Sequence, residues 1–401
     1  MTTVLDPPAA RAPAAPPPRR ATSDIVVEVR RSSELPGIEP HWRALFVEAA
    51  EPNPFLGPDF LGALARLRDH RFQVALAWRR MGGSRALVGL LPFTREPGLP
   101  LVRPPLLRSL SDPLVANATP LVAADGADLV LERLVAGLAG LFPRSVLLLE
   151  PLRLGGPIAT GLAGAGRPNH LSREIERAAV RAEIPSGDYL ATRIAGKRVR
   201  ELRRCEKRLA EAGTVETRTL WGAAAQPAVD AFLAIEASGW KGRQGTALAS
   251  RSRLLAFARE ALSGTAPGLA ADLMTLDGKP IAAALHLVAG GEAVAFKCAY
   301  DETWAKASPG ALLDVHTLLM TLDSGQLSLM DSGALPGHPV EGLWRERIAF
   351  GRMLVDLRRG AEPGNLEPLS GRLDSIEHLT GALKARIKSA LGRKTTALRA
   401  S

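Results

Sequence analysis

The sequence predicts an α/β (α+β) fold in which two similar mixed-sheet units follow one another, joined by a basic helix and followed by a C-terminal helix. One observation is the order of the expected elements, since strand, two helices, antiparallel strands, helix and strand occur twice along the 401 residues. The other is composition, because a chain with 46% hydrophobic residues has enough apolar material for two ordinary domains. We expect the first unit over residues 24–185 and the second over residues 186–358.

The first unit begins with a strand-like run at residues 25–30. The turn Met81-Gly82-Gly83 separates two apolar runs, residues 73–78 and 85–92, and is typical of a β-hairpin. The other elements that we expect here are helices at 40–50 and around 65–67, a helix at 127–141 and a buried strand at 145–150.

The second unit repeats this order. Asp277-Gly278 marks a second hairpin between residues 271–276 and 281–288. A helix over 309–322 has proline in its first turn, where the missing N–H costs nothing. The other expected elements are a strand at 215–220, a helix at 227–238, a loop at 239–246, a helix at 251–262 and strands at 292–299 and 327–331.

A strongly basic helix is expected between the units, ending at Gly213 as its C′ residue. Its cations suit a polyphosphate, tRNA or an anionic glycan, but it has no interleaved aromatic residues for stacking bases, and three glutamates offset it. A solvated helix face is the competing interpretation. The cations are Arg198, Arg200, Arg203, Arg204, Lys207 and Arg208.

The two ends of the chain differ in pattern. Residues 1–23 are rich in Pro, Ala and Arg, and we expect a disordered tail. Residues 359–401 are expected to form a C-terminal tail with a basic amphipathic helix from about 376 to 391, because apolar residues recur there every four positions. These residues are Leu379, Leu383, Ile387 and Leu391.

Charge and cysteine usage limit the function classes. The net charge of +10 is compatible with an anionic partner or with a merely basic protein. Cys205 and Cys298 lie far apart without metal-ligand spacing, which favours a reducing compartment and no metal site. Because neither a secretory signal nor a run of ~18 apolar residues is found, we expect a cytoplasmic protein without a transmembrane segment.

Four segments of the second unit form a recognisable pattern. They are Gly239-Trp240-Lys241-Gly242 with Gly245-Thr246-Ala247-Leu248, Phe296-Lys297-Cys298-Ala299-Tyr300-Asp301, Ser308-Pro309-Gly310 and Leu343-Trp344-Arg345. They resemble the CelD/BcsL-type acetyltransferases, which are tandem GNAT proteins often linked to bacterial cellulose or exopolysaccharide production, and more distantly the FemABX peptidyltransferases. The resemblance covers roughly residues 26–357. It implies two GNAT-like halves and transfer of an acyl group from acetyl-CoA or another acyl-CoA.

The resemblance to GNAT proteins implies that the donor's pyrophosphate binds at the start of the helix that follows the fourth strand of the second half. A helix N-terminus offers unpaired N–H groups and a positive dipole end to phosphates. Gly310 lets the backbone approach a ligand, and Ser308 is able to cap the helix. An ordinary Ser-Pro helix start is the competing interpretation. The expected donor-binding residues are Ser308, Pro309, Gly310, Ala311 and Leu312.

The first half lacks an evident counterpart of that segment. Its equivalent stretch, residues 111–120, has no glycine before the helix. We therefore expect the donor site in the second half only.

Candidate catalytic residues are Asp331, Asp301 and Lys241. Asp331 ends the strand after the donor helix, where α/β sites lie, and a carboxylate there suits a general base. Both aspartates are equally typical of turns. Lys241 follows Trp240 in a glycine-rich loop that suits a flat or anionic substrate group, although a core tryptophan beside a solvated lysine has the same pattern.

Candidate substrate-binding residues are Trp240, Lys297 and Tyr300. Lys297 interrupts an apolar strand and therefore points either to solvent or into a cleft. Tyr300 is able to donate a hydrogen bond or to pack at an edge. His286 fits a core histidine better than a base, and Cys298 has no sequence-adjacent base, so we do not assign it as a nucleophile.

Three hypotheses follow. The first is an acyl-CoA-dependent acyltransferase that needs no metal and modifies an amine or hydroxyl of a sugar, a glycan or a small metabolite. The second is an aminoacyl-tRNA-dependent transferase, the one hypothesis in which nucleic acid is a partner. The third is a non-catalytic GNAT scaffold for a polysaccharide synthase. One fold serves all three, and the oligomeric state is left open.

Overall fold

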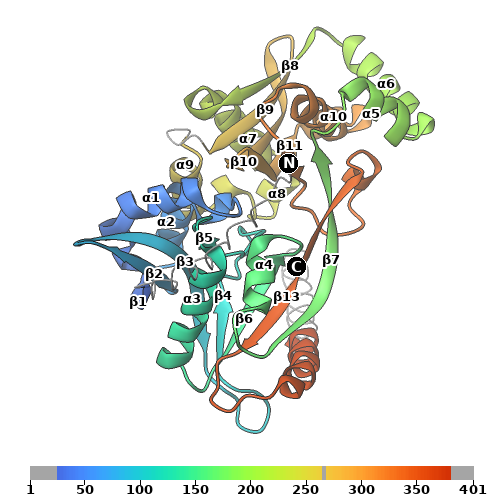
Figure 1. The fold of residues 1–401 in the computed structure, drawn as a ribbon. Helices are drawn as coiled ribbons and strands as arrows, with labels where there is room; N and C mark the ends of the chain where they lie inside the picture. Colours follow the sequence, from blue (N-terminus) through green and yellow to red (C-terminus); the bar gives the residue numbers. More distant parts are fainter. Residues whose placement is uncertain (1–24, 264–267, 381–401) are drawn as a thin grey trace, which may run out of the picture.

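The computed structural model describes residues 25–263 and 268–380, so the predicted tail at 1–23 and most of the predicted helix at 376–391 lie outside the described part. One 13-stranded mixed sheet runs through the molecule, which confirms the predicted α/β class (Figure 1). The strands lie in the order β1-β2-β3-β4-β6-β13-β7-β12-β11-β10-β9-β8, with β5 paired to β3.

The first half of the chain supplies β1 to β7 and α1 to α4. Its strands are β1 (Ile25–Arg31), β2 (Gln73–Met81), β3 (Ser84–Glu96), β4 (Leu106–Ser109), β5 (Leu121–Val122), β6 (Val146–Arg153) and β7 (Asn169–Arg181). Its α-helices are α1 (Glu39–Glu48), α2 (Pro58–Leu67), α3 (Ala127–Leu141) and α4 (Pro157–Ala163), with short 3-10 helices η1 (Ser32–Ile38) and η2 (Pro54–Leu56). Gly82 and Gly83 have positive φ and close the predicted β2–β3 hairpin.

The second half supplies the remaining elements. Its strands are β8 (Val215–Trp221), β9 (Leu269–Leu276), β10 (Lys279–Ala289), β11 (Glu292–Tyr300), β12 (Leu329–Asp331) and β13 (Glu346–Asp356). Its α-helices are α5 (Ser186–Arg193), α6 (Gly196–Ala210), α7 (Gln226–Ser238), α8 (Trp240–Arg243), α9 (Ser252–Ala261) and α10 (Pro309–Asp323). The 3-10 helices are η3 (Gly222–Ala225), η4 (Leu248–Ser250), η5 (Glu302–Ala307), η6 (Pro339–Gly342) and η7 (Pro363–Asn365).

The two halves exchange their last strands. β13 from the second half pairs antiparallel with β6 of the first, and β7 from the first half pairs antiparallel with β12 of the second. β7 and β13 also pair with each other along most of their length (Figure 1). The sheet is therefore continuous, and each half is completed by a strand of the other.

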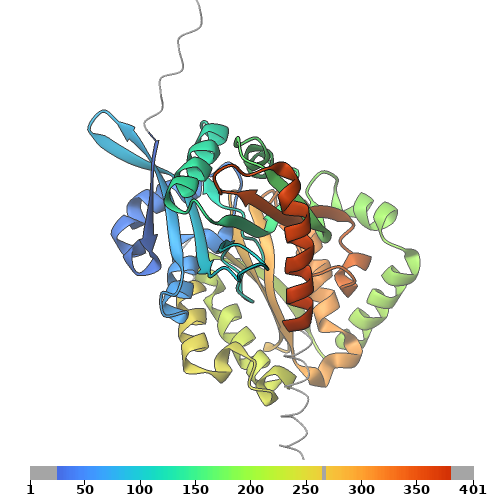
Figure 2. The same cartoon turned by 90° about the horizontal axis from the view of Figure 1, so that it is seen from below.

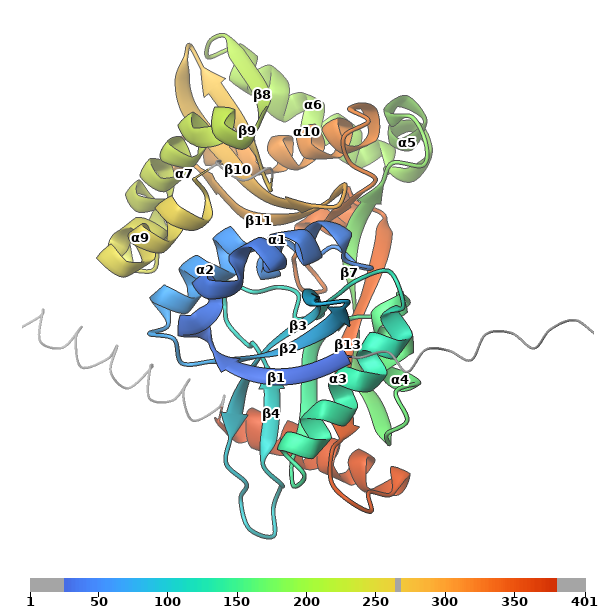
Figure 3. The ribbon, with the colours of Figure 1, turned by 60° about the vertical axis from the view of Figure 1, so that its left-hand side comes forward.

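The halves share a hydrophobic core as well as a sheet. α1 and α2 of the first half lie against α9 and β11 of the second (Figure 3). The Phe60 ring makes edge contacts with Phe257 on α9 and Phe296 on β11, at centroid distances of 5.4 and 5.6 Å. Burying such rings stabilises the fold by about 1.5–3 kcal/mol each, and edge-on packing of aromatic pairs adds to this.

A helix at residues 366–380 covers the sheet of the first half (Figure 2). Its buried leucines, Leu366, Leu369 and Leu373, recur at helical spacing and pack against β4, β6 and β13. The helix was predicted to begin ten residues later, at about 376, with an apolar stripe from Leu379. Its first member, Leu379, is 67% exposed, because the helix begins earlier and is buried by its first turns.

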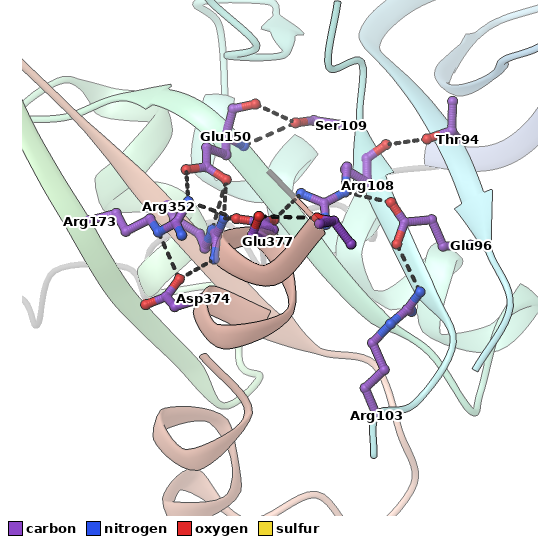
Figure 4. A network of polar contacts seen from close by, with 11 residues as sticks. Thr94, Glu96, Arg103, Arg108, Ser109, Glu150, Arg173, Arg352, Asp374 and Glu377 are labelled. Atoms are coloured by element: carbon purple, nitrogen blue, oxygen red, sulfur yellow. Dashed lines mark hydrogen bonds and ion pairs between the residues drawn. The ribbon is translucent and has the colours of Figure 1, made fainter. Parts of the chain in front are cut away.

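Buried charges fasten this helix to the sheet (Figure 4). Arg352 on β13 is fully buried, and its guanidinium donates to Glu150 on β6 at 2.7 Å, to Asp374 at 2.8 Å and to Glu377 at 2.6 Å. Arg173 on β7 also pairs with Asp374 and Glu377 at 2.7 Å. The network therefore ties both exchanged strands to the helix that follows them.

The predicted role of Gly213 is wrong. α6 ends at Ala210, and its C-cap residue Glu211 is right-handed. A Cβ at Gly213 would lie 2.3 Å from Asp277 Oδ2, in the hairpin between β9 and β10. Glycine is needed because that hairpin approaches closely. None of the helices in the described part of the chain combines the length and apolar character needed to cross a membrane.

Candidate functional site

The edge of β11 that faces β12 is paired along only part of its length. It pairs in parallel with β12 through Glu292, Ala293 and Val294, after which the two strands separate. A bulge opposite Leu285 and His286 interrupts its pairing with β10 at the same point. Since Asp301 N–H bonds to Ile281 O on β10, strand alternation turns the main-chain groups of Tyr300 and Cys298 toward the unpaired edge.

α10 begins beside this edge. Ser308 has φ of 48° and forms no side-chain cap, so its predicted capping role is wrong; the left-handed backbone turns the chain into the helix instead. The N–H groups of Gly310 and Ala311 have no hydrogen-bond partner within the described residues. A Cβ at Gly310 would lie 3.4 Å from the Tyr300 ring. Two free donors and the positive end of α10 therefore lie next to Tyr300.

A small pocket of about 70 Å³ opens at the unpaired edge. Its lining includes three of the predicted site residues, Trp240, Lys241 and Tyr300, together with Cys298. Trp240 and Tyr300 are 53% and 41% exposed, so both rings are available to a ligand. The predicted loop at 239–246 contains the short helix α8, which brings Trp240 and Lys241 to the pocket.

Lys241 is fixed by a buried carboxylate. Its Nζ lies 3.0 Å from Glu236 Oε1 on α7, and Glu236 Oε2 accepts from Leu248 N–H at 2.8 Å. Lys297 is half-buried on β11 with its Nζ 5.2 Å from the Phe296 ring. Burial, and then the positive charge of Lys241, lower the pKa of Lys297. Sequence alone did not bring these two lysines together.

Asp301 and Asp331 are engaged elsewhere. Asp301 caps η5 by accepting from Thr303 N–H at 2.9 Å, and its pKa is lowered by the Thr303 side chain and then by this N–H. Asp331 is buried at the seam between the halves, 3.5 Å from Arg177 on β7, and it accepts from Gly333 N–H at 2.9 Å. Burial raises its pKa, although Arg177 opposes this.

Asp314 is a candidate that sequence reasoning missed. It lies on α10 one turn after Gly310, and therefore on the same side of the helix. Burial raises its pKa to about 6, and its carboxylate has no hydrogen-bond partner within the described residues. A carboxylate four residues after the Pro-Gly start of a largely apolar helix was the signal in the sequence.

The corresponding place in the first half differs from the expectation. Its donor-helix counterpart is α3, which lies at the predicted residues Ala127–Leu141, but a glycine with positive φ, Gly126 (φ of 70°), directly precedes it. The edge of β6 beyond its parallel pairing with β4 is occupied: Ala118 N–H donates to Pro151 O at 2.8 Å, and Arg153 N–H donates to Thr119 Oγ1 at 2.9 Å. The first half thus has a similar helix start, but the adjacent edge of β6 is bonded to the chain between β4 and β5.

No group of three or more His, Cys, Asp or Glu side chains is arranged to hold a metal ion within residues 25–263 and 268–380.

Several solved structures are similar to this chain at low sequence identity. The C-terminal domain of a putative lysylphosphatidylglycerol synthetase from Agrobacterium fabrum is 11% identical, with 84% of this chain and 96% of that chain covered and a TM-score of 0.49. FemX is 11% identical, with 82% and 98% covered and a TM-score of 0.48. A tandem GNAT protein from the clavulanic acid biosynthesis pathway is 14% identical, with 84% and 100% covered and a TM-score of 0.39.

Among curated proteins, none matches this chain. Residues 196–337 match the family described as acetyltransferase (GNAT) domain. This stretch includes the pocket at the β11 edge, the start of α10 and Asp314. The second half of the chain, over residues 196–337, therefore carries a GNAT acetyltransferase domain.

Proposed function

We propose that this protein is an acyl-CoA-dependent acyltransferase that works at the β11–α10 site and modifies an amine or hydroxyl of a sugar, a glycan or a small metabolite. The observation that carries the proposal is the pair of free N–H groups on Gly310 and Ala311 beside the unpaired edge of β11. The family match over the same residues supports acyl transfer. The sequence resemblance to CelD/BcsL-type proteins supports a carbohydrate acceptor linked to cellulose or exopolysaccharide production.

In this proposal the donor's phosphates bind at the start of α10. Residues 308–312 supply main-chain donors there, and the helix dipole favours negative charge. The rest of the donor follows the free edge of β11, where the outward main-chain groups of Cys298 and Tyr300 accept and donate hydrogen bonds as a paired strand would. Tyr300 and Trp240 flank that path, and Lys241 and Lys297 give it positive charge.

The transfer step needs a base for the acceptor's proton. Asp314 suits this role better than Asp331 or Asp301, because its carboxylate is free of partners and has a pKa of about 6. The acceptor's nitrogen or oxygen bonds to the acyl carbon, its proton passes to Asp314, the C–S bond breaks, and the departing thiolate takes up a proton. A main-chain N–H on the β11 edge is placed to stabilise the oxyanion.

The test is calorimetric titration of acetyl-CoA and longer acyl-CoAs into the full chain and into a Gly310→Trp variant. We expect saturable binding by the unmodified protein and loss of binding in the variant, because the indole would occupy the space beside Tyr300. Gly140→Trp is the matched control, since Gly140 lies on α3 with open space around it. Absence of binding by the unmodified protein would contradict the proposal.

The exposed face of α6 favours an aminoacyl-tRNA donor as the second candidate. Arg200, Arg203, Arg204 and Lys207 are all exposed there. RNA binding that disappears when Arg203 and Arg204 are both changed to Glu would support this candidate. Protein that carries no RNA through purification, and binds none, would count against it.

A further inference from the structure

A buried polar cluster lies under α10, in the middle of the apolar face of the second half. At its centre is Asp272 on β9, which is fully buried. Its carboxylate accepts from Thr219 Oγ1 on β8 and from Thr317 Oγ1 on α10, both at 2.6 Å, and lies 2.9 Å from His286 Nε2 on β10. Burial opposes ionisation of Asp272, but His286 and the two hydroxyls outweigh it and lower its pKa.

His286 is held by this carboxylate through one nitrogen only. The side chain is 1% exposed, and its Nδ1 has no hydrogen-bond partner within the described residues. A buried ring nitrogen without a partner is unfavourable, so a water or a nearby polar group is expected to complete its hydrogen bonding. The acyltransferase chemistry proposed above assigns no role to this imidazole.

Asp314 lies over the same cluster. It is three residues before Thr317 on α10, so the two side chains share a helix face, and Thr317 contacts Asp272. The Asp314 main-chain oxygen accepts from Trp344 Nε1 at 3.0 Å, whereas its carboxylate is unpaired among the described residues. Two polar groups without a partner among the described residues, His286 Nδ1 on the sheet and the Asp314 carboxylate on α10, therefore belong to the two elements that pack around this cluster.

We propose that His286 is a positioning residue for Asp314: Asp272 anchors the imidazole through Nε2, and Nδ1 reaches the Asp314 carboxylate through one water and favours its ionised form. This rests on the proposed function, in which Asp314 accepts the proton of the acceptor. The chain Asp272–His286–Asp314 keeps a half-buried carboxylate ionised without a direct ion pair. A direct salt bridge such as that of Asp331 with Arg177 would leave the base less able to accept a proton.

Other charged groups face Asp314 from the surrounding elements. Arg198 on α6 lowers its pKa, as His286 does, against the larger effect of burial. Cys298 on β11 is electrostatically coupled to Asp314, Asp272 and Lys241. His316, two residues along α10, has its Nε2 2.9 Å from Thr219 Oγ1 and 3.6 Å from Asp272 Oδ1, on the other carboxylate oxygen. His316→Gln is therefore a matched control that removes a histidine from the cluster without touching His286.

The experiment is an NMR titration of the full chain with ¹³C-labelled aspartate and ¹⁵N-labelled histidine, with assignments from Asp314→Asn and His286→Gln. In the unmodified protein we expect Asp314 to titrate near pH 6, and the His286 ring nitrogens to report the same transition. In His286→Gln the Asp314 midpoint should move to higher pH, because a group that favours the carboxylate has been removed. In His316→Gln it should stay within about 0.3 pH units of its original value.

If His286→Gln does not fold, the titration of the unmodified protein is sufficient to test the proposal. His286 nitrogens that do not respond across the Asp314 transition would overturn the proposal, as would an unchanged Asp314 midpoint in a folded His286→Gln protein. The acid limb of the kcat/KM profile should also move to higher pH in that variant. The titration needs no acyl donor, so a protein that shows the coupling but binds no acyl-CoA would refute the proposed function and leave the coupling standing.

Discussion

The helices α3 and α10 begin alike in the two halves of the chain and differ in what surrounds their first turns. Each has 15 residues and follows a left-handed residue, Gly126 or Ser308. In the second half the next residues are Pro309 and Gly310, and the neighbouring strand edge is unpaired. In the first half the position of Gly310 is taken by Asp128, and the neighbouring edge is bonded to the chain between β4 and β5.

This difference shows that forming the fold and forming a donor site depend on different features of the chain. Strand order, hairpins and the parallel strand pair recur in both halves because each half needs them to bury its apolar faces. A donor site additionally needs free main-chain donors without a nearby carboxylate. In the first half Asp125 also lies before the helix, paired to Arg79 at 2.7 Å, so a phosphate would meet two carboxylates.

The largest difference between the two halves is expected in the effect on kcat of substituting the sixth residue of α10 or of α3. Asp314→Asn should lower kcat by about 10²–10⁴-fold, because the general base is lost, while acyl-CoA affinity changes little. The measurement is release of the CoA thiol from acetyl-CoA in the presence of a panel of amines and amino sugars. Glu132→Gln, at the same place on α3 and exposed, should leave the rate unchanged. Equal losses in both variants would refute the assignment of the base.

The next effect concerns the helix at 366–380, which covers the first half only. Arg352→Met should lower the free energy of unfolding by about 3–5 kcal/mol, because three carboxylates lose a fully buried partner. Urea unfolding followed by circular dichroism measures this. Arg359→Met is the control, since that side chain is exposed and should change stability by less than about 0.5 kcal/mol. A loss below 1 kcal/mol would show that the network does not fasten the helix.

A smaller effect on stability should come from loosening the chain between β4 and β5, which bonds to the edge of β6. Asn53 is fully buried and donates to Thr119 O at 2.7 Å and Asn117 O at 3.2 Å. Asn53→Ala should lower the free energy of unfolding by about 1–3 kcal/mol, because two buried carbonyl groups lose their donor. Calorimetric affinity for acyl-CoA should stay unchanged in the folded fraction. Weakened donor binding would mean that the first half contributes to the donor site.

The smallest effect on stability is expected from exchanging the residues that precede α3 and α10. Ser308→Gly should raise stability by up to about 1 kcal/mol, and Gly126→Ser should lower it by a similar amount, because positive φ favours glycine. A Cβ at Gly126 would also lie 3.3 Å from Arg79 Nη2. Thermal unfolding of both variants measures the pair. Changes of the same sign would indicate that backbone conformation is not the determining factor at these positions.

Sequence periodicity was sufficient to predict the helices and strands that are apolar on at least one face. The helices α3 and α10 and the two hairpins lie where the patterns predict them. The strands β7 and β13 were not predicted. Both carry several charged residues, and Arg352 in β13 is buried only because β6, β7 and the last helix bring carboxylates to it. A strand whose charges are neutralised by distant segments has no local apolar signature.

For the candidate site, the sequence indicated the start of α10 and the residues Trp240, Lys241, Lys297 and Tyr300. Three of these line one pocket. The turn alternative given for Asp301 and Asp331 describes the local contacts that they make with the N–H groups of Thr303 and Gly333. The sequence did not reveal that Asp331 also pairs with Arg177, which comes from a distant strand. Nor did it reveal that the Asp314 carboxylate has no hydrogen-bond partner among the described residues.

By itself, the sequence determined the repeated order of elements, the turn glycines and the helix start that suits an anionic donor, because each depends on residues close together in the chain. The tertiary structure alone decided the exchange of β7 and β13, the pairing of the β6 edge with the chain between β4 and β5, and the burial that raises the pKa of Asp314. These features depend on which distant strands become neighbours. Strand pairing and burial, rather than local propensity, set those neighbours.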